Sequence, residues 1–408
     1  MTGSPINAPP LVDREDRVAE IAAAVAAAGS MAFDLEFVSA DRYVPELALV
    51  QVAWGDPDAP ELALVDPLAV DPAPLFALIA DPQVQVVAHA ARQDLGLLAT
   101  CHQTVARALV DTQIAAAMAG LADQIGYARL VEQLVGARVD KAHQHTDWKR
   151  RPLSEAQRRY AASDVLHLPR VWRELARRLE ERGRASWARE ESERLARTAA
   201  RRRPPEEAYL SIGGWGGLKG PARAILRELA AWREREALAS NTPPSWIAPD
   251  AALCELARRA PRRPGEIGRV RGLPGGSARR YGEAIVEAIE RGAASGEPVA
   301  PPRTPGAAEQ AQAAMVLAIV QARSGEAELP VRMVGGRGEA DALVAWHREG
   351  GGAQPPPGEV LLLEGWRAEL CGADALAWLR GEIALAADPG GAGGLRLIDL
   401  RRSAVTGR

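Results

Sequence analysis

The sequence predicts an α/β domain with a mixed sheet, followed by all-helical domains. Four apolar runs of strand length fall within the first 90 residues, and short, turn-like spacers separate the first three, as in a meander. From residue 90 to about residue 180 the apolar residues recur with helical spacing instead. Two segments rich in proline and glycine divide the rest of the chain. At 408 residues and 47% hydrophobic, the chain is long enough for two or three domains.

The first domain begins with a helix at residues 14–28, which ends at Gly29. Four strands follow, at residues 32–38, 46–54, 60–68 and 84–90. The spacer before the fourth strand can hold a helix, and helices continue after it, with one short strand around ALVDT. Because a meander is antiparallel and helical crossovers connect parallel strands, the sheet should be mixed.

Changes in composition predict the domain boundaries. A charged helix at about 182–203 ends in RRRPP, so residues 1–203 form the first domain with a trailing linker helix. Residues 204–295 form a small helical domain, and SGEPVAPPRTPG links it to a third helical part at 304–408. Helical runs in the third part include EQAQAAMVLAIVQARSG and GADALAWLRGEIALA. The stretch YLSIGGWGGLKG lacks the G-K-[ST] ending of a phosphate loop and follows no clear strand, which favours a flexible hinge.

Charge and cysteine usage narrow the class of protein. The net charge of −3 indicates no polyanionic partner for the chain as a whole, but residues 219–291 hold 14 Lys and Arg against 9 Asp and Glu, a local net of +5. Three widely spaced cysteines fit a reducing compartment and have no zinc-site spacing. The sequence shows neither a secretory signal nor an apolar run long enough to span a membrane. We therefore expect a cytoplasmic protein without a membrane partner.

Two carboxylates interrupt the first apolar strand, AFDLEFV. Side chains alternate along a strand, so Asp34 and Glu36 share one face; alone, such a pair is typical of a solvated edge strand. A third acid, Asp94, begins a helix near the end of the sheet, where α/β folds place ligands. Further on, Tyr160 and Asp164 are four residues apart and therefore lie on one face of a helix. Taken together, these four acids and one tyrosine are difficult to explain as solvated surface residues.

Four carboxylates that converge on one end of a sheet repel one another unless cations bind among them. Oxygen ligands favour hard ions such as Mg²⁺ or Mn²⁺. Two such ions can hold the attacking and the leaving oxygen of an in-line phosphoryl displacement. The acids therefore make a two-metal nuclease plausible.

The motifs around these residues resemble a known family. FDLEF, the acid in HAARQDL, and YAASD are similar to the three exonuclease motifs of the DEDD superfamily, tyrosine subclass, and within it to the ribonuclease D family. LKGPARAILRELAAWRE and the segment ending in SARRYGEAIVEAI resemble the helicase and RNase D C-terminal (HRDC) domain, and GWRAELCGADALAW loosely resembles a second such domain. The resemblance implies a ribonuclease H-like, mixed-sheet exonuclease domain followed by all-helical C-terminal domains.

The resemblance also implies roles for the five residues. Asp34, Glu36 and Asp164 would ligate one of two Mg²⁺ or Mn²⁺ ions, and Asp34 would bridge to the second, which Asp94 reaches directly or through water. Tyr160 would orient the attacking water, because a phenol with an unperturbed pKa near ~10 is a poor general base at neutral pH.

Several residues near the motifs are candidates for contact with nucleic acid. His89 and Gln93 either touch the terminal nucleotide or serve as hydrogen-bonded scaffold, and Asp111 should cap a helix. The loop DKAHQHTDWKRRPL combines cationic side chains with one ring for stacking, and it is either an RNA-facing surface or a solvated loop. Its candidate RNA contacts are Lys141, Trp148, Lys149, Arg150 and Arg151.

The sequence therefore predicts a monomeric, cytoplasmic 3′–5′ exoribonuclease. It would trim the 3′ ends of structured RNA, for which the resemblance implies tRNA precursors, and release nucleoside 5′-monophosphates. A DNA 3′–5′ exonuclease remains an alternative, because nothing in the sequence reads the 2′-hydroxyl. A catalytically silent RNA-binding scaffold is a second alternative, which the presence of all five motif residues disfavours. A regulator that acts through the helical domain alone would leave the acids unexplained.

Overall fold

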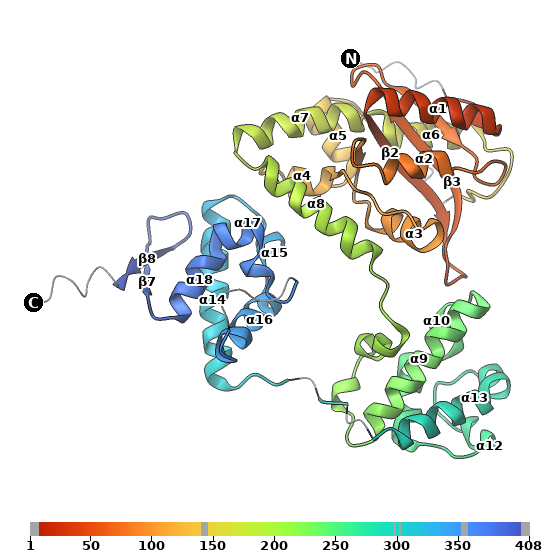
Figure 1. Cartoon of the computed structure of the whole chain (residues 1–408), viewed down its shortest axis with the longest axis vertical. Coiled ribbons are helices and arrows are strands. Elements are labelled where there is room, and N and C mark those ends of the chain that lie inside the picture. Colours follow the sequence, from red (N-terminus) through yellow and green to blue (C-terminus); the bar gives the residue numbers. More distant parts are fainter. Residues whose placement is uncertain (1–7, 140–145, 297–298, 302, 352–357, 401–408) are drawn as a thin grey trace, which may run out of the picture.

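The computed structural model describes residues 8–139, 146–296, 299–301, 303–351 and 358–400. It consists of an α/β domain, a helical domain and a third, mainly helical part (Figure 1). Among the described residues, no helix combines the length and the apolar character that crossing a membrane requires.

The α/β domain is built on a mixed sheet, as the sequence predicts, and this sheet has six strands. The strand order is β1-β4-β3-β2-β5-β6; β2, β3 and β4 form an antiparallel meander, whereas β1 pairs with β4, and β5 with β2 and β6, in parallel. The strands are β1 (Leu11–Val12), β2 (Ser30–Val38), β3 (Glu46–Trp54), β4 (Glu61–Val65), β5 (Gln85–Ala88) and β6 (Leu109–Asp111). The short edge strand β1 is not predicted from the sequence.

Helices cover both faces of this sheet. Alternation along β3 separates two cores: Val50 and Val52 pack with α1, α2 and α3, whereas Leu49 and Ala53 face α6 and α7. Ser154 starts α6 through a capping box with Gln157. The helices of this domain are α1 (Glu15–Ala28), α2 (Ala73–Ile79), α3 (Arg92–His102), α4 (Thr112–Met118), α5 (Tyr127–Val135), α6 (Glu155–Leu166), α7 (Leu168–Glu181) and α8 (Ala185–Ala200).

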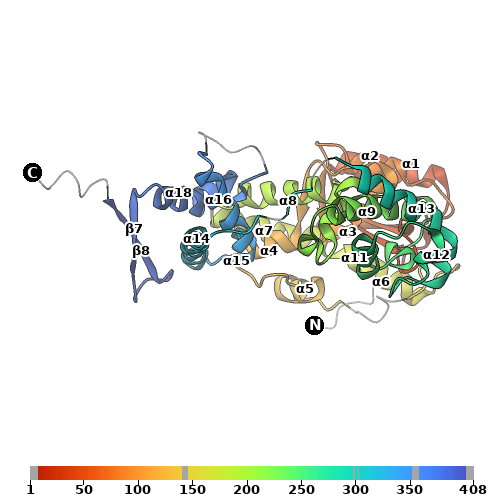
Figure 2. The same ribbon diagram turned by 90° about the horizontal axis from the view of Figure 1, so that it is seen from below.

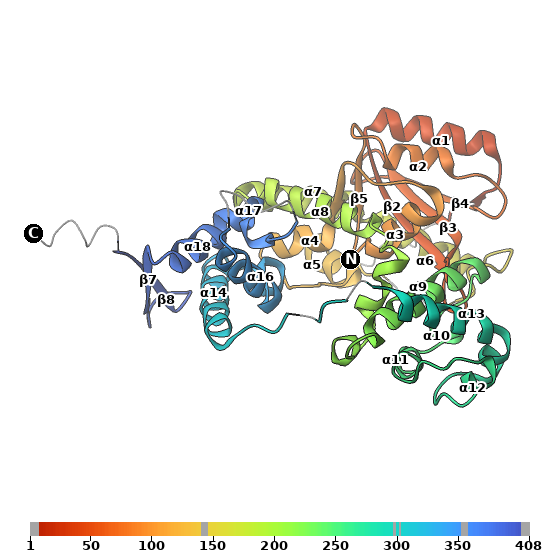
Figure 3. The same cartoon turned by 60° about the horizontal axis from the view of Figure 1, so that its bottom comes forward.

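The helical domain packs its two long helices closely. A Cβ added to Gly292 on α13 would lie 2.4 Å from the Cα of Ile225 on α9, so only glycine permits this helix contact. Its helices are α9 (Ala222–Ser240), α10 (Pro244–Ile247), α11 (Asp250–Arg259), α12 (Pro264–Ile267) and α13 (Gly275–Ala294). Tyr43, in the turn between β2 and β3, packs against this domain and hydrogen-bonds to Glu234 on α9, and the Val44 amide donates to Asn241 Oδ1 at 2.7 Å. The helical domain is therefore attached to the hairpin that carries β2 (Figure 3).

The third part differs from the all-helical expectation. The sequence predicts one helical run through GADALAWLRGEIALA, but α18 ends at Leu379, and residues beyond it form a hairpin of β7 (Ile383–Ala387) and β8 (Leu395–Asp399). The intervening DPGGAGG supplies turn residues that a helix would not tolerate. The helices are α14 (Ala307–Glu326), α15 (Val331–Val334), α16 (Arg337–Arg348), α17 (Gly365–Arg367) and α18 (Ala373–Leu379).

The third part shares a hydrophobic core with the α/β domain. Buried side chains of α4, α7 and α8 join those of α14, α16 and α17 in one cluster, and the third part lies beside this end of the domain (Figure 2). Trp366 stacks on Trp187 of α8 with ring centroids 5.4 Å apart. The adjacent Arg367, 2% exposed, donates to Glu191 of α8 at 2.7 Å and to two backbone carbonyls. The sequence treats this part as separate, whereas its packing makes it integral to the α/β domain.

Candidate active site

Three carboxylates meet on the face of the sheet that α6 covers. Asp34 and Glu36 come from β2, and Asp164 comes from α6. Ligand oxygens of the three residues all lie within 4.8 Å of one another. The period of two along β2 places the first two side chains together, and helix α6 packs against the neighbouring β3 and β4 and brings the third.

Asp94 lies close to this cluster from the first turn of α3. Its side chain is buried, and burial raises its pKa, with a further increase from the negative charge of Asp34. Because the charge of Asp34 acts on Asp94, these two carboxylates are close enough to repel each other. Asp94 is nevertheless not one of the three acids whose ligand oxygens lie within 4.8 Å of one another.

None of the four acids forms an ion pair within the described part of the chain, and their pKa values are correspondingly high. Burial raises the pKa of Asp34 to about 7. Burial, followed by the charges of Asp34 and Asp164, raises the pKa of Glu36 to about 9. Burial and the charge of Asp34 raise the pKa of Asp164 to about 8. At neutral pH, protons or cations must therefore offset these charges.

The donor set fits divalent cations. Carboxylate oxygens are the ligands that Mg²⁺ and Mn²⁺ prefer, and acids that pair with no cationic side chain among the described residues leave the compensating charge to an ion. Asp34, Glu36, Asp94 and Asp164 are the residues that could hold such ions.

Tyr160 lies one turn before Asp164 on α6, and its hydroxyl is close enough to the Asp164 carboxylate for the two groups to shift each other's pKa. Burial and the charge of Asp164 raise its pKa, so the phenol stays protonated at neutral pH. Trp148 packs against it, with ring centroids 5.9 Å apart. The hydroxyl is therefore held at the edge of the acid cluster.

The other candidate residues near the motifs, His89, Gln93 and Asp111, differ in their burial and in their hydrogen bonds. His89 is held by a 2.9 Å contact between its Nδ1 and Thr112 Oγ1, whereas Gln93 is exposed on α3. Asp111 caps α4, as predicted, and its carboxylate also accepts bonds from the backbone amides of Ala90 and Ala91. The predicted nucleotide contacts of His89 and Gln93 remain predictions.

The basic loop differs from the expected RNA-facing surface. Trp148 is only 3% exposed, so its ring cannot stack on a base. Lys149 pairs with Glu46 at 2.9 Å, and Arg151 pairs with Asp66 at 2.6 Å. Arg150 is exposed, and Lys141 lies outside the described residues. A run of cations in the sequence does not reveal that distant carboxylates already pair with two of them.

Two features escape the sequence analysis. Gln51 is buried beside Asp34, and its signal is one amide inside the otherwise apolar stretch LALVQVAW. A set of exposed arginines in the helical domain is visible in the sequence only as a local charge excess.

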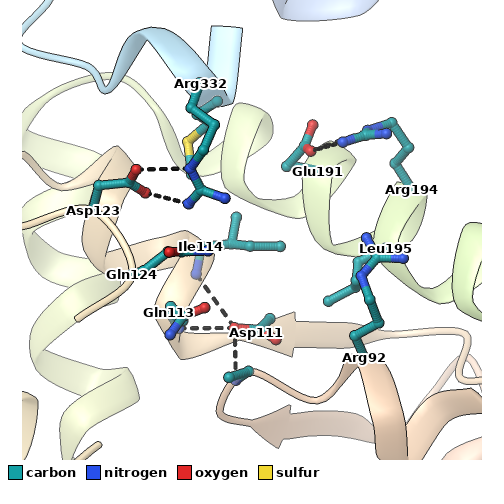
Figure 4. A pocket seen from close by; sticks show the side chains of 12 residues that line it. Arg92, Asp111, Gln113, Ile114, Asp123, Gln124, Glu191, Arg194, Leu195 and Arg332 are labelled. Carbon is teal, nitrogen blue, oxygen red and sulfur yellow. Dashed lines mark hydrogen bonds and ion pairs between the residues drawn. The ribbon is translucent and has the colours of Figure 1, made fainter. Parts of the chain in front are cut away.

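A separate cavity of about 220 Å³ lies between the α/β domain and the third part (Figure 4). None of the four acids lines it. Four of the charged side chains that line the cavity form ion pairs with one another: Arg332 pairs with Asp123, and Arg194 pairs with Glu191. The cavity therefore belongs to the junction between the two parts rather than to the acid cluster.

The fold and the acid cluster define a 3′–5′ exonuclease with an appended HRDC domain. Residues 9–180 match the 3′-5′ exonuclease family, and residues 222–289 match the HRDC domain. Ribonuclease D of Acidiphilium cryptum is 38% identical over 386 residues, which cover 93% of this chain and 95% of the relative. Ribonuclease D of Gluconacetobacter diazotrophicus is 37% identical over 365 residues, 88% of this chain and 89% of the relative.

A solved structure agrees with these matches. The crystal structure of Escherichia coli RNase D, described as an exoribonuclease involved in structured RNA processing, superimposes with a TM-score of 0.82 at 28% identity, over 91% of this chain and 98% of that one. The chain belongs to the ribonuclease D family of 3′–5′ exoribonucleases, which use divalent metal ions.

Asp34→Asn should separate folding from catalysis. In the metal-free protein, the folded state keeps a proton on Asp34 up to a pKa of about 7, whereas the unfolded state releases it near ~4. The stability of the wild-type chain should therefore fall as pH rises through this window, by on the order of 4 kcal/mol from this group. The asparagine variant should lack that loss and also lack RNA hydrolysis.

The measurement is the urea unfolding midpoint in EDTA at pH 5 and pH 8 for both proteins, repeated with Mn²⁺. We expect Mn²⁺ to raise the midpoint of the wild type but not of the variant. An identical pH dependence of the two proteins, or equal stabilisation by Mn²⁺, would contradict the assignment of Asp34.

Proposed function

We propose that this chain removes nucleotides one at a time from the 3′ ends of structured RNAs, tRNA precursors among them, by hydrolysis at two divalent ions. The observation that carries the proposal is the cluster of buried carboxylates without a cationic partner among the described side chains. The structured substrate is proposed because the E. coli relative is an exoribonuclease involved in structured RNA processing. The three cysteines are free, which fits action as a monomer in the reducing cytoplasm.

The carboxylates divide between two ion positions. Asp34, Glu36 and Asp164 would hold one ion, and Asp34 with Asp94 would hold the second. When bound, such ions lower the pKa of the attacking water and stabilise the charge that develops on the phosphate. The water oxygen would bond to phosphorus and lose a proton, the bond from phosphorus to the 3′ oxygen of the preceding nucleotide would break, and that oxygen would take up a proton as the nucleoside 5′-monophosphate leaves.

Tyr160 would orient the water. Its hydroxyl lies beside Asp164 and would donate its proton to that carboxylate, which would leave the lone pairs of the phenolic oxygen free to accept a hydrogen bond from the water. Its raised pKa excludes a role as general base at neutral pH. The packing of Trp148 restricts the ring and supports this positioning role.

A time course on matched oligonucleotides tests the proposed function. RNA and DNA strands of one sequence, labelled at the 5′ end, would be incubated with Mg²⁺ or Mn²⁺. We expect RNA to shorten in single-nucleotide steps and to release nucleoside 5′-monophosphates, with no reaction in EDTA. Internal cleavage, or faster shortening of DNA than of RNA, would refute the proposal.

Tyr160→Phe should affect turnover rather than binding. The variant keeps the ring that packs on Trp148 but loses the hydroxyl, so we expect kcat to fall by roughly 10²-fold with little change in KM. Steady-state kinetics on a short single-stranded RNA measure both constants. An unchanged kcat would show that the hydroxyl does not position the water.

The helical domain carries an arginine surface, which we define as the exposed arginines in the loops on either side of α12 and at the start of α13. Its members are Arg262, Arg263, Arg269, Arg271, Arg279 and Arg280. None of the six takes part in an ion pair with another described residue. Unpaired, exposed guanidinium groups are suited to contact RNA phosphates, so we propose that this surface holds the body of the substrate.

Replacing two members of this surface should weaken RNA binding in a salt-dependent way. Arg262→Ala with Arg263→Ala should flatten the log–log salt dependence of binding by about 0.7 to 0.9 for each RNA phosphate that the variant no longer neutralises. A matched control exists on α11, where Arg258→Ala with Arg259→Ala removes guanidinium groups that already pair with Glu255.

The measurement is affinity for a hairpin with a 3′ tail at several salt concentrations. Point variants are preferable to truncation after residue 203, because truncation would strip the shared core from α4, α7 and α8. Equal slopes for the wild type and the Arg262/Arg263 variant, or equal losses of affinity in both variants, would show that the arginine surface does not bind phosphates. The kcat on short single strands should be unchanged in both.

A further inference from the structure

Gln51 occupies an unusual position in the middle of β3. Its side chain has no exposed surface, and neither its amide nitrogen nor its amide oxygen has a hydrogen-bond partner within the described residues. A buried amide normally finds a partner, because burial without one loses the hydrogen bonds made to water in the unfolded chain. The role of Gln51 is therefore not explained by packing alone.

The register of the sheet places Gln51 beside a carboxylate of the acid cluster. Gln51 lies directly opposite Asp34 in the antiparallel pair of β3 and β2. Side chains that are directly opposite each other point to the same face, with Cβ atoms about 5 Å apart. The same register sets Leu49 opposite Glu36 and Ala53 opposite Ala32, so Gln51 is the polar member of this row on β3.

Within the described residues, Gln51 makes no hydrogen bond to its other neighbours, although Tyr160 of α6 packs against the same core. On its second side, β3 pairs with β4, where Leu64 is the residue opposite Gln51. The helix above, α6, contributes Ala161 to the core that contains Leu49 and Leu64. The nearest polar groups in the register are thus the carboxylate of Asp34 and the acids that gather around it.

We infer that Gln51 is a positioning residue for Asp34: with the ions bound, its amide N–H donates a hydrogen bond to the Asp34 carboxylate and fixes its orientation. This inference rests on the proposed two-metal function. Ligating carboxylates commonly accept such a bond from a neighbouring side chain, which restricts their rotation and tunes their affinity for the ion. The orientation of the Asp34 carboxylate matters for both ions, because Asp34 would ligate each of them.

Gln51→Met tests the inference, because methionine keeps the length and apolar stem of the side chain but cannot donate. Gln51→Leu is a second variant for the case that the thioether packs poorly. Leu49→Met is the matched control, since it changes the neighbouring residue of the same row, opposite Glu36, by a volume-conserving substitution. Three quantities are measured: the urea unfolding midpoint in EDTA, Mn²⁺ affinity by calorimetry, and kcat and KM on short RNA.

We expect Gln51→Met to bind Mn²⁺ about 10- to 100-fold more weakly than the wild type. The unfolding midpoint in EDTA should be equal or higher, because the substitution removes two buried polar atoms that have no partner. The kcat should fall at limiting Mn²⁺ and recover in part at high Mn²⁺, with KM for RNA unchanged. Leu49→Met should leave the Mn²⁺ affinity unchanged.

Wild-type Mn²⁺ affinity in both Gln51 variants would overturn the inference and leave the two-metal function standing. An equal loss of Mn²⁺ affinity in Leu49→Met would also overturn it, because local packing would then be the cause. If the wild type itself bound no Mn²⁺ and hydrolysed RNA in EDTA, both the inference and the proposed function would fall.

Discussion

The burial of four carboxylates, with no ion pair to a cationic side chain among the described residues, is the constraint on which this structure depends. Each carboxylate loses hydration on folding, and each raises the energy of the others, which explains why the pKa values of Asp34, Glu36 and Asp164 rise so far. The arrangement is stable only because apolar cores on both faces of the sheet hold β2 and α6 in place. The same repulsion that opposes folding would be relieved by a divalent cation bound among these carboxylates.

A continuous series of contacts runs from the third part of the chain to the acid cluster. Arg367 donates to Glu191 on α8, and the adjacent Ser192 accepts a hydrogen bond from the Asp111 amide. The Asp111 carboxylate in turn binds the backbone amides that precede α3, the helix that carries Asp94. The third part therefore supports the catalytic domain structurally, through buried polar contacts and a shared core.

Local rules are sufficient for the parts of the site that depend on short spacings. Alternation along a strand brings Asp34 and Glu36 to one face, helical spacing brings Tyr160 and Asp164 together, and Asp111 caps α4 as its position before a helix indicates. The mixed sheet likewise follows from the order of strands and helices.

Features that depend on residues far apart in the chain could not be predicted from the sequence. The loop cations Lys149 and Arg151 look available for RNA in the sequence, but their partners Glu46 and Asp66 are 103 and 85 residues away. The shared core of the third part is likewise set by tertiary packing between segments far apart in the chain. The role of Gln51 follows only from the register that sets it opposite Asp34.

Anomalous diffraction from crystals grown with Mn²⁺ and a nucleoside 5′-monophosphate tests the central claim most directly. The account predicts two manganese peaks, one among Asp34, Glu36 and Asp164 and one shared by Asp34 and Asp94. Absence of manganese from these four carboxylates, in crystals of protein that degrades RNA with Mn²⁺, would contradict it.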